Sequence, residues 1–397
     1  MKKKTMPLFI ILVLIISIVG LFIYDGTPNN TEKKDNNITE VKAKVLSVDN
    51  SDVVRSGISS IGHQNLKAEV KEGKYKGYNV DAKSNLIGKL DMDTFVEEGD
   101  TIVLGLREKD NLIKDAIVLE HYRHNWLLIM FGVFVICLIL YARIIGIKAL
   151  FSFIASLYVI WGFLIPGLLN GKNPLVLATL VLMLLSAIII FSVAGFTRKG
   201  VSAFVGTMMG LIITIAITIF FGEKLGLRGM TQPFAESLLF SGHLNLNMKH
   251  ILYAAIIIGA SGAAMDIAMD ITASMEEIKS KKPEISTKEL IQSGFNVGRS
   301  VIGTMTTTLL LAYSGGYLTL LMLFMTKDSS FIRIVNLKIV STEIMRTVVG
   351  SIGLVLVAPL TAVFGGWILT FDFKRFRKTV KTYNKSEEIS ETAASKE

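Results

Sequence analysis

The sequence predicts an all-α polytopic membrane helix bundle of about eight spans, joined to a small β-rich extracytoplasmic domain of the OB or SH3-like barrel type. Two observations lead to this fold class. Of the 397 residues, 51% are hydrophobic and only 19% are charged, which is too apolar for a chain covered by water. Long apolar runs recur along the chain, and residues 25–125 interrupt them with short alternating runs instead.

A membrane-spanning helix needs roughly 20 apolar residues. By this measure we predict spans at Pro7–Tyr24, Trp126–Ala142, Lys148–Leu169, Pro174–Phe196, Val201–Phe221, Ile251–Met275, Ser300–Met325 and Thr347–Thr370. Three lysines precede the first run and no small-x-small cleavage site follows it, which favours a retained anchor over a cleaved signal peptide. Basic residues cluster after alternate spans, so the positive-inside rule places both termini in the cytoplasm.

The predicted domains are a signal anchor at 1–24, a polar linker at 25–39, a β-rich extracytoplasmic domain at 40–124, a seven-helix membrane domain at 125–373 and a tail at 374–397, basic and then disordered. Five strands are expected in the β-rich domain, at Val41–Val48, Leu66–Val70, Tyr78–Ala82, Thr101–Leu106 and Ile113–Leu119. This domain shows neither a metal-ligand cluster nor a nucleophile with a base, so we expect a docking or gating cap and no cofactor.

Charge and cysteine content exclude two further classes. The net charge is +9, but the basic residues flank apolar runs, so we expect no nucleic-acid partner. The single cysteine, Cys137, excludes an intramolecular disulfide framework. The spans contain neither a serine-histidine set nor an HExxH run, and we therefore expect no enzyme.

The sixth span carries the strongest functional signal. Small and acidic residues recur there at three- and four-residue steps, and so share one helical face: Gly259, Gly262, Ala263, Asp266, Asp270, Ala273 and Glu277. Buried carboxylates in a membrane are costly, which favours a proton carrier or a cation site completed by oxygen atoms from Ser261, Thr272 or the next helix. The alternative is structural, with Arg299 pinning the sixth span to the seventh. The identity of any metal stays open.

The seventh and eighth spans add weaker signals. Thr304, Thr306, Thr307 and Thr308 supply hydroxyls, and Tyr313–Gly316, with Gly315 and Gly316, could interrupt the helix as in transporters with broken spans. Close helix packing is the alternative for these glycines, and it is the expected role of six others: Gly206, Gly210, Gly259, Gly262, Gly350 and Gly353. Glu343 and Arg346 predict an ion pair at the outer surface. Ser286 and Glu289 predict a capping box before a short helix at Thr287–Gln292.

Three runs resemble the YibE/F family of bacterial multi-pass membrane proteins. They are Ile256–Met269, Gly298–Gly315 and Glu343–Leu354 with Pro359, in that order along the chain. The resemblance implies a location in the bacterial cytoplasmic membrane, and it carries over an aspartate at Asp266 and an arginine at Arg299. This chain departs from the family pattern at Asp270 and Ser300, and Thr307 stands where an amide is frequent. No substrate follows from the resemblance.

Two functional hypotheses remain. The first is a transporter or permease for a small solute or ion, with proton coupling through Asp266 as one option. The second is a non-transporting scaffold or accessory subunit, whose exterior domain binds a cell-envelope partner through residues 40–122. The expected partners in either case are the lipid bilayer and either further copies of the chain or a related membrane subunit.

Overall fold

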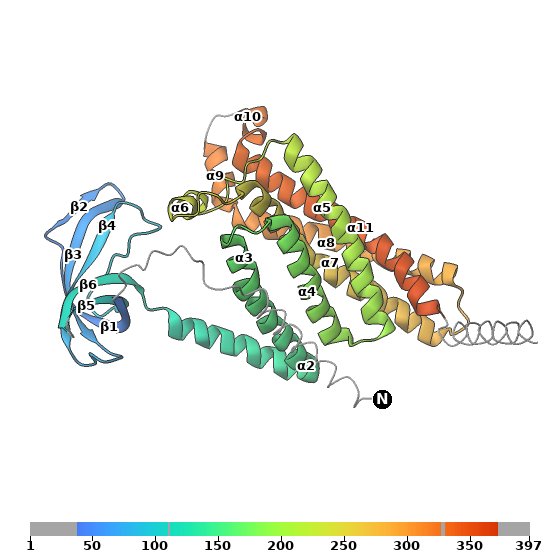
Figure 1. Cartoon of the computed structure of the whole chain (residues 1–397), viewed down its shortest axis with the longest axis horizontal. Helices are drawn as coiled ribbons and strands as arrows, with labels where there is room; N and C mark the ends of the chain where they lie inside the picture. The colour runs from blue at the N-terminus through green and yellow to red at the C-terminus, as the bar shows by residue number, and fades with distance from the viewer. Residues whose placement is uncertain (1–37, 110–111, 327–329, 372–397) are drawn as a thin grey trace, which may run out of the picture. The chain divides into compact units, whose positions relative to one another are not determined.

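The computed structural model describes residues 38–109, 112–326 and 330–371, which form two compact units divided at Arg143. The first predicted span, Pro7–Tyr24, and the C-terminal tail lie outside the described residues. The N-terminal unit contains a small β-barrel, and the C-terminal unit consists of long apolar helices (Figure 1). This confirms the coarse fold class, while the number of membrane crossings stays a prediction.

The barrel closes because its first strand pairs on both sides. β1 pairs with β3 and with β5, and the ring β1-β5-β6-β4-β3 then returns to β1. A register shift between Val45 and Ser47 bends β1, which lets one strand serve both neighbours. The ring strands are β1 (Ile38–Asp49), β3 (Ser59–Val70), β4 (Asn79–Ile87), β5 (Thr101–Lys109) and β6 (Leu112–His121). The sequence analysis missed β2 (Val53–Ser56), which extends the sheet beside β3.

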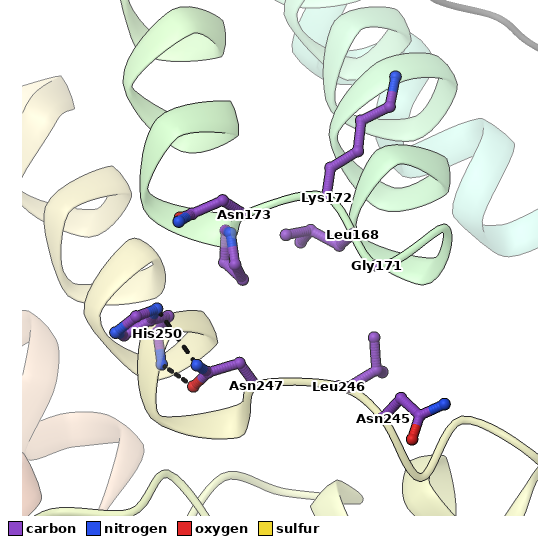
Figure 2. Close-up of a pocket in the computed structure, with 9 residues that line it drawn as sticks. Leu168, Gly171, Lys172, Asn173, Asn245, Leu246, Asn247 and His250 are labelled. Carbon is purple, nitrogen blue, oxygen red and sulfur yellow. Dashed lines mark hydrogen bonds between the residues drawn. The ribbon is translucent and has the colours of Figure 1, made fainter.

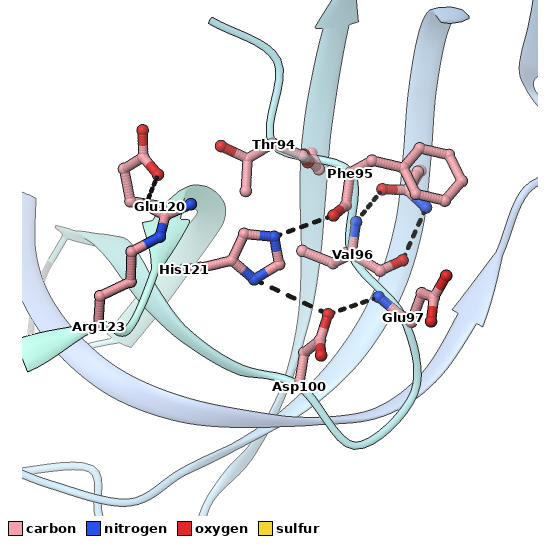
Figure 3. Close-up of polar contacts among 10 residues, drawn as sticks. Thr94, Phe95, Val96, Glu97, Asp100, Glu120, His121 and Arg123 are labelled. Carbon is pink, nitrogen blue, oxygen red and sulfur yellow. Dashed lines mark hydrogen bonds and ion pairs between the residues drawn. The ribbon is translucent and has the colours of Figure 1, made fainter. Parts of the chain in front are cut away.

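Buried polar side chains fasten the loop between β4 and β5 onto the barrel. Gln64 is fully buried and both donates to the Val96 carbonyl (3.0 Å) and accepts from the Val96 amide (2.9 Å). His121, at the end of β6, contacts the same loop: its Nε2 donates to the Phe95 carbonyl at 3.0 Å, and its Nδ1 lies 3.8 Å from the Asp100 carboxylate (Figure 3). These contacts add to the packing of Val96, which is itself part of the apolar core of the barrel.

Among the described residues, five helices are long and apolar enough to cross a membrane, or up to six if one bent pair counts as a single span. The first runs from α2 (His124–Val159) through a π-helical turn, η1 (Ile160–Leu164), into α3 (Ile165–Leu169). Its 46 residues would extend roughly 69 Å as one helix, about twice the hydrocarbon core. Arg143 breaks it with a backbone φ of 49°, between the two spans predicted for this segment.

The remaining helices form the bundle. They are α4 (Pro174–Ala194), α5 (Arg198–Lys224), α6 (Ala235–Phe240), α7 (Met248–Lys281), α8 (Thr287–Gly316), α9 (Leu318–Thr326), α10 (Phe331–Val335) and α11 (Lys338–Thr370). Asn173, Thr197, Asn247 and Ser286 cap α4, α5, α7 and α8 through their side chains. The capping box of Ser286 and Glu289 is confirmed. The predicted short helix Thr287–Gln292 is wrong, because these residues continue without a break into α8.

Glycines bring α5 and α11 together, and Figure 1 shows the two helices side by side. A Cβ on Gly206 would lie 2.8 Å from the Thr361 Cα, and one on Gly210 would lie 3.1 Å from the Val357 Cα. The GxxxG pair of α5 therefore packs directly against the backbone of α11, as its spacing predicts.

Polar contacts show which helix ends meet. At one end of the bundle, Lys199 on α5 lies 3.4 Å from the Glu276 carboxylate on α7. At the same end, the hydroxyls of Thr287 on α8 and Thr370 on α11 form a hydrogen bond of 2.8 Å. At the opposite end Lys249 on α7 pairs with Glu223 on α5 at 2.8 Å. The basic connections that follow α4 and α7 therefore lie at the same end of the bundle.

The predicted seventh span is not one straight helix. α8 begins at Thr287, well before the expected Ser300, and a bend of 68° separates it from α9. The break falls at Tyr317, directly after Gly315 and Gly316, both of which are still helical. No atom lies within 4 Å of a Cβ built on either glycine, so neither position is used for close packing.

We predict that Gly210→Leu destabilises the bundle, because the new side chain would meet the backbone of α11. The expected cost is about 1–3 kcal/mol, the usual range for overpacking. The measurement is the thermal unfolding midpoint of the purified protein in detergent. Gly132→Leu is the matched control, because nothing lies within 4 Å of a Cβ at that position. Equal midpoints for the two variants would contradict the packing role.

Candidate functional site

One side of α7 is exposed and carries the stripe that the sequence predicted. Gly259, Gly262, Asp266, Asp270 and Glu277 are all exposed in the structure, whereas the opposite side of α7 is buried in the core of the bundle. Exposed large apolar side chains are frequent on α2, α4, α5 and α11, but none occurs from Met248 to Leu309. This surface therefore lacks the large exposed apolar side chains found elsewhere on the bundle.

A polar face on α8 accompanies the face on α7. Its exposed residues repeat at helical spacing and are almost all polar or glycine: Gln292, Asn296, Arg299, Ser300, Gly303, Thr304, Thr307 and Thr308. The opposite side of α8 contacts α7 and α11 through Gly294 and Gly298. α8 is thus amphipathic, with its apolar side against the bundle.

The contacts between α7 and α8 fix which residues are level with one another. A Cβ on Gly294 would lie 2.7 Å from the Met275 sulfur, and one on Gly298 would lie 3.3 Å from the Ile271 Cδ1. Because the helices are antiparallel, the same register places Asp270 level with Arg299.

The same register extends along both helices, and puts Asp266 level with Gly303 and Gly262 level with Thr307. Tyr313 on α8 reaches across to the exposed side of α7, because its hydroxyl lies 2.7 Å from a Cβ built on Gly259. The exposed sides of the two helices therefore adjoin. We call this joint surface, from Gly259 to Glu277 and from Gln292 to Thr308, the α7–α8 polar face.

The three charged groups at the centre of this face are unpartnered. Within the part of the chain that the structure describes, the side chains of Asp266, Asp270 and Arg299 form no hydrogen bond or ion pair. Each such charge costs about 2.5–3.5 kcal/mol at the centre of a membrane helix on insertion scales. A helix surface of this kind requires water or a further partner.

Two expectations about these residues are wrong. Arg299 does not pin the two helices by an ion pair with Asp266, because no such pair forms among the described residues. Ser261 and Thr272 do not complete a cation site, because both are buried on the other side of α7 and donate to the carbonyls of Ile258 and Ala268. No group of three metal-ligating side chains occurs among the described residues either.

A second charged cluster lies beside the break between α8 and α9. Glu343 and Arg346 on α11 pair at 3.6 Å, and Arg346 donates to the Tyr317 hydroxyl at 3.5 Å. The pair was expected at the outer surface, but only 14% and 15% of the two side chains are exposed. The Glu343 Oε2 and the Arg346 Nε and Nη2 are buried without a hydrogen-bond partner among the described residues. Only part of the hydrogen-bonding capacity of this pair is therefore used, and the pair lies beside the break between α8 and α9.

The other predicted glycines divide into two groups. A Cβ built on Gly350 would lie 3.1 Å from the Leu309 Cδ2, and one on Gly353 would lie 3.2 Å from the Thr214 Cγ2, so both glycines lie at helix contacts. Gly262 was expected to allow a neighbouring helix to approach, but nothing lies within 4 Å of a Cβ built there. This position is open in the described part of the chain.

A polar cavity lies apart from these groups, between the α3–α4 connection and the start of α7 (Figure 2). Its volume is about 280 Å³, and its polar lining comes from Lys172, Asn173, Asn245, Asn247 and His250. The amide of His250 donates to the Asn247 side chain at 3.0 Å, so part of this lining already caps α7. The cavity contains no residue that the sequence analysis singled out as a site.

A family comparison covers the helices that carry both charged clusters. Residues 130–371 match the model of the family described as YibE/F-like protein. The chain belongs to the YibE/F-like family. The matched region contains α4 to α11 and excludes the barrel, so the YibE/F-like part of the chain is the helical unit. Comparisons with curated proteins and with solved structures gave no match.

Sequence reasoning missed part of the polar face in this YibE/F-like chain. Gln292 and Asn296 continue the face of Arg299 and Gly303 at steps of three and four residues. The signal was present, but Thr287–Gln292 was treated as a separate helix, which hid the periodicity of α8. The close contacts of Gly294 and Gly298 were missed for the same reason, although they form a GxxxG pair.

We predict that removing one member of the Glu343–Arg346 pair lowers the free energy of unfolding more than replacing both members by apolar residues. Arg346→Met alone leaves a buried carboxylate without its partner, and should destabilise the protein by about 3–5 kcal/mol. The double variant Glu343→Leu with Arg346→Met should be less destabilised than this single variant. Unfolding midpoints of the unaltered protein, of the single variants Arg346→Met and Glu343→Leu and of the double variant, all in detergent, would measure the difference. Additive losses in the double variant would show that the pair has no energetic coupling.

Proposed function

We propose that the helical unit crosses the cell membrane several times, with the N-terminal apolar run as a retained anchor and both chain termini in the cytoplasm. The exposed apolar side chains of α2, α4, α5 and α11 support contact with lipid. The shared end of the basic connections after α4 and α7 supports the orientation, since both would then face the cytoplasm.

We propose further that this unit is a transporter or permease for a small solute or ion. One observation carries the proposal: three charges without a partner among the described residues lie in the middle of long helices, on a face without exposed large apolar side chains. Asp266 lies roughly 27 Å along α7 from its first residue, at a rise of 1.5 Å per residue. Ionisable groups at such depth generally mark ion, proton or substrate paths.

The bend between α8 and α9 supports the same proposal. Broken spans in transporters place helix ends and charged groups near the substrate path. Here the break at Tyr317 lies beside the half-satisfied pair of Glu343 and Arg346. In this proposal Asp266 carries a proton or cation along the polar face, and the break supplies the element that can change conformation.

We predict that Asp266→Asn abolishes proton- or solute-linked flux in proteoliposomes and leaves assembly unchanged, because the amide keeps the shape but not the ionisable group. Flux is measured with a pH-sensitive dye inside the vesicles, and assembly by size-exclusion chromatography. Glu236→Gln is the matched control, because Glu236 is an exposed carboxylate on α6, outside the α7–α8 polar face. Loss of assembly in Asp266→Asn, with flux per folded molecule unchanged, would favour a structural role.

A scaffold function is the second candidate, and one feature of the barrel favours it. Val54, Ile61 and Ile87 are neighbours across β2, β3 and β4, and they are 68%, 50% and 61% exposed. Ile58, at the adjacent hairpin tip, is 86% exposed. A row of exposed apolar side chains on a small water-facing barrel is typical of a protein-binding surface.

The scaffold proposal predicts that a photo-crosslinking residue at Ile61 captures a cell-envelope protein in intact cells. The same residue at Lys114, which is exposed on β6, should capture none. Ile87→Ser should weaken the crosslink from position 61 without changing expression. An identical pattern from positions 61 and 114 would exclude the apolar row as a binding surface.

A further inference from the structure

The α7–α8 polar face needs a covering partner, and its own charges indicate which one. Glycine, carboxylate, hydroxyl and amide side chains cover it, whereas the lipid-facing sides of α4 and α5 expose residues such as Leu180 and Ile212. The N-terminal apolar run, Pro7–Tyr24, contains no charged residue that could neutralise Asp270 or Arg299. A suitable partner must present a cation opposite α7 and an anion opposite α8.

A second copy of this chain meets that requirement by symmetry. Consider a two-fold axis parallel to the helices and passing in front of the groove between α7 and α8. Such an axis keeps every residue at its level in the membrane and exchanges the two helices, so that α7 of one copy faces α8 of the other. Because Asp270 and Arg299 are level within one chain, each Asp270 then faces the Arg299 of the second copy.

The same operation matches the rest of the face. Gly262 faces Thr307 of the second copy, and Asp266 faces Gly303, so a small residue opposes a larger one at each level. The absence of any atom within 4 Å of a Cβ on Gly262 or Gly303 leaves room for this approach. Small residues at such positions let membrane helices pack closely.

We infer that the α7–α8 polar face is the interface of a homodimer, in which Asp270 of each copy pairs with Arg299 of the other. The two polar faces then enclose the acidic groups between the copies instead of exposing them to lipid. The inference concerns what completes the face, and it holds whether or not the face conducts a solute. Its test measures association only, so its failure and the failure of the transport proposal are distinguishable.

The first experiment uses one cysteine per copy, in a background that carries Cys137→Ser. A tagged copy with Gly262→Cys is co-expressed with a differently tagged copy with Thr307→Cys, and the membranes are oxidised with copper phenanthroline. We expect a disulfide between the two tags. Because each copy has one cysteine, no crosslink can form within a chain. Leu180→Cys with Met183→Cys, on the exposed apolar side of α4, is the matched control and should give none.

The second experiment tests the charge pairing between copies. Asp270→Arg and Arg299→Asp, each introduced alone into both copies, should reduce the 262–307 crosslink about tenfold, because like charges then face each other. Co-expressing one copy with Asp270→Arg and one with Arg299→Asp should restore the crosslink, since both cross-copy pairs are again opposite in sign. Pairing within a chain predicts no such recovery, because each variant chain carries two like charges.

Three outcomes would overturn the inference. One is the absence of a 262–307 crosslink with the natural charges, a test that needs no charge substitution and so does not depend on the folding of the reversal variants. Another is a crosslink of Gly262→Cys to a cysteine within residues 7–24 of its own chain. The third is a 262–307 crosslink no stronger than that of the Leu180→Cys with Met183→Cys control, which would show random collision of copies and no specific interface.

Discussion

A carboxylate or guanidinium group on an apolar helix is stable only where water or an opposite charge receives it. This constraint organises the helical unit. α7 is buried on one side by α4, α5, α8 and α11, and its core side consists of residues such as Ile267, Ile271 and Met275. Its other side carries Asp266 and Asp270 without a partner among the described residues. One side of α7 is therefore well packed, whereas the other exposes charges that cost free energy on an apolar helix. The charged side is the surface on which the proposals for this unit rest.

The two charged clusters differ in how far their charges are compensated within the chain. Glu343 and Arg346 neutralise each other within α11, one helical turn apart, and are almost fully enclosed. Asp270 and Arg299 are level but belong to different helices and stay apart within the chain. The pair of Glu343 and Arg346 is already formed inside the bundle, next to the bend at Tyr317. Asp270 and Arg299 leave their charges on a surface that a partner can complete. Transport and dimerisation are compatible, because a path between two copies would be lined by both polar faces.

The barrel obeys a different constraint. On β4, buried and exposed residues alternate strictly, and Val80, Ala82, Ser84 and Leu86 are buried. The exposed apolar row on β2, β3 and β4 departs from the usual polar outer surface of a water-facing barrel. The family match covers the helical unit and not the barrel, so the features that define the family lie in the helices.

The sequence by itself determined the long apolar helices, the barrel strands and the common face of Asp266 and Asp270, because these follow from local periodicities of two and 3.6 residues. The helix cap formed by Ser286 and Glu289 was predictable for the same reason, because both residues lie within one helical turn. The bend at Tyr317, the burial of Glu343 with Arg346 and the opposite orientation of Ser261 were decided only by the tertiary structure. Each of them depends on which helix lies beside which, and the spacing of residues along one helix does not contain that information.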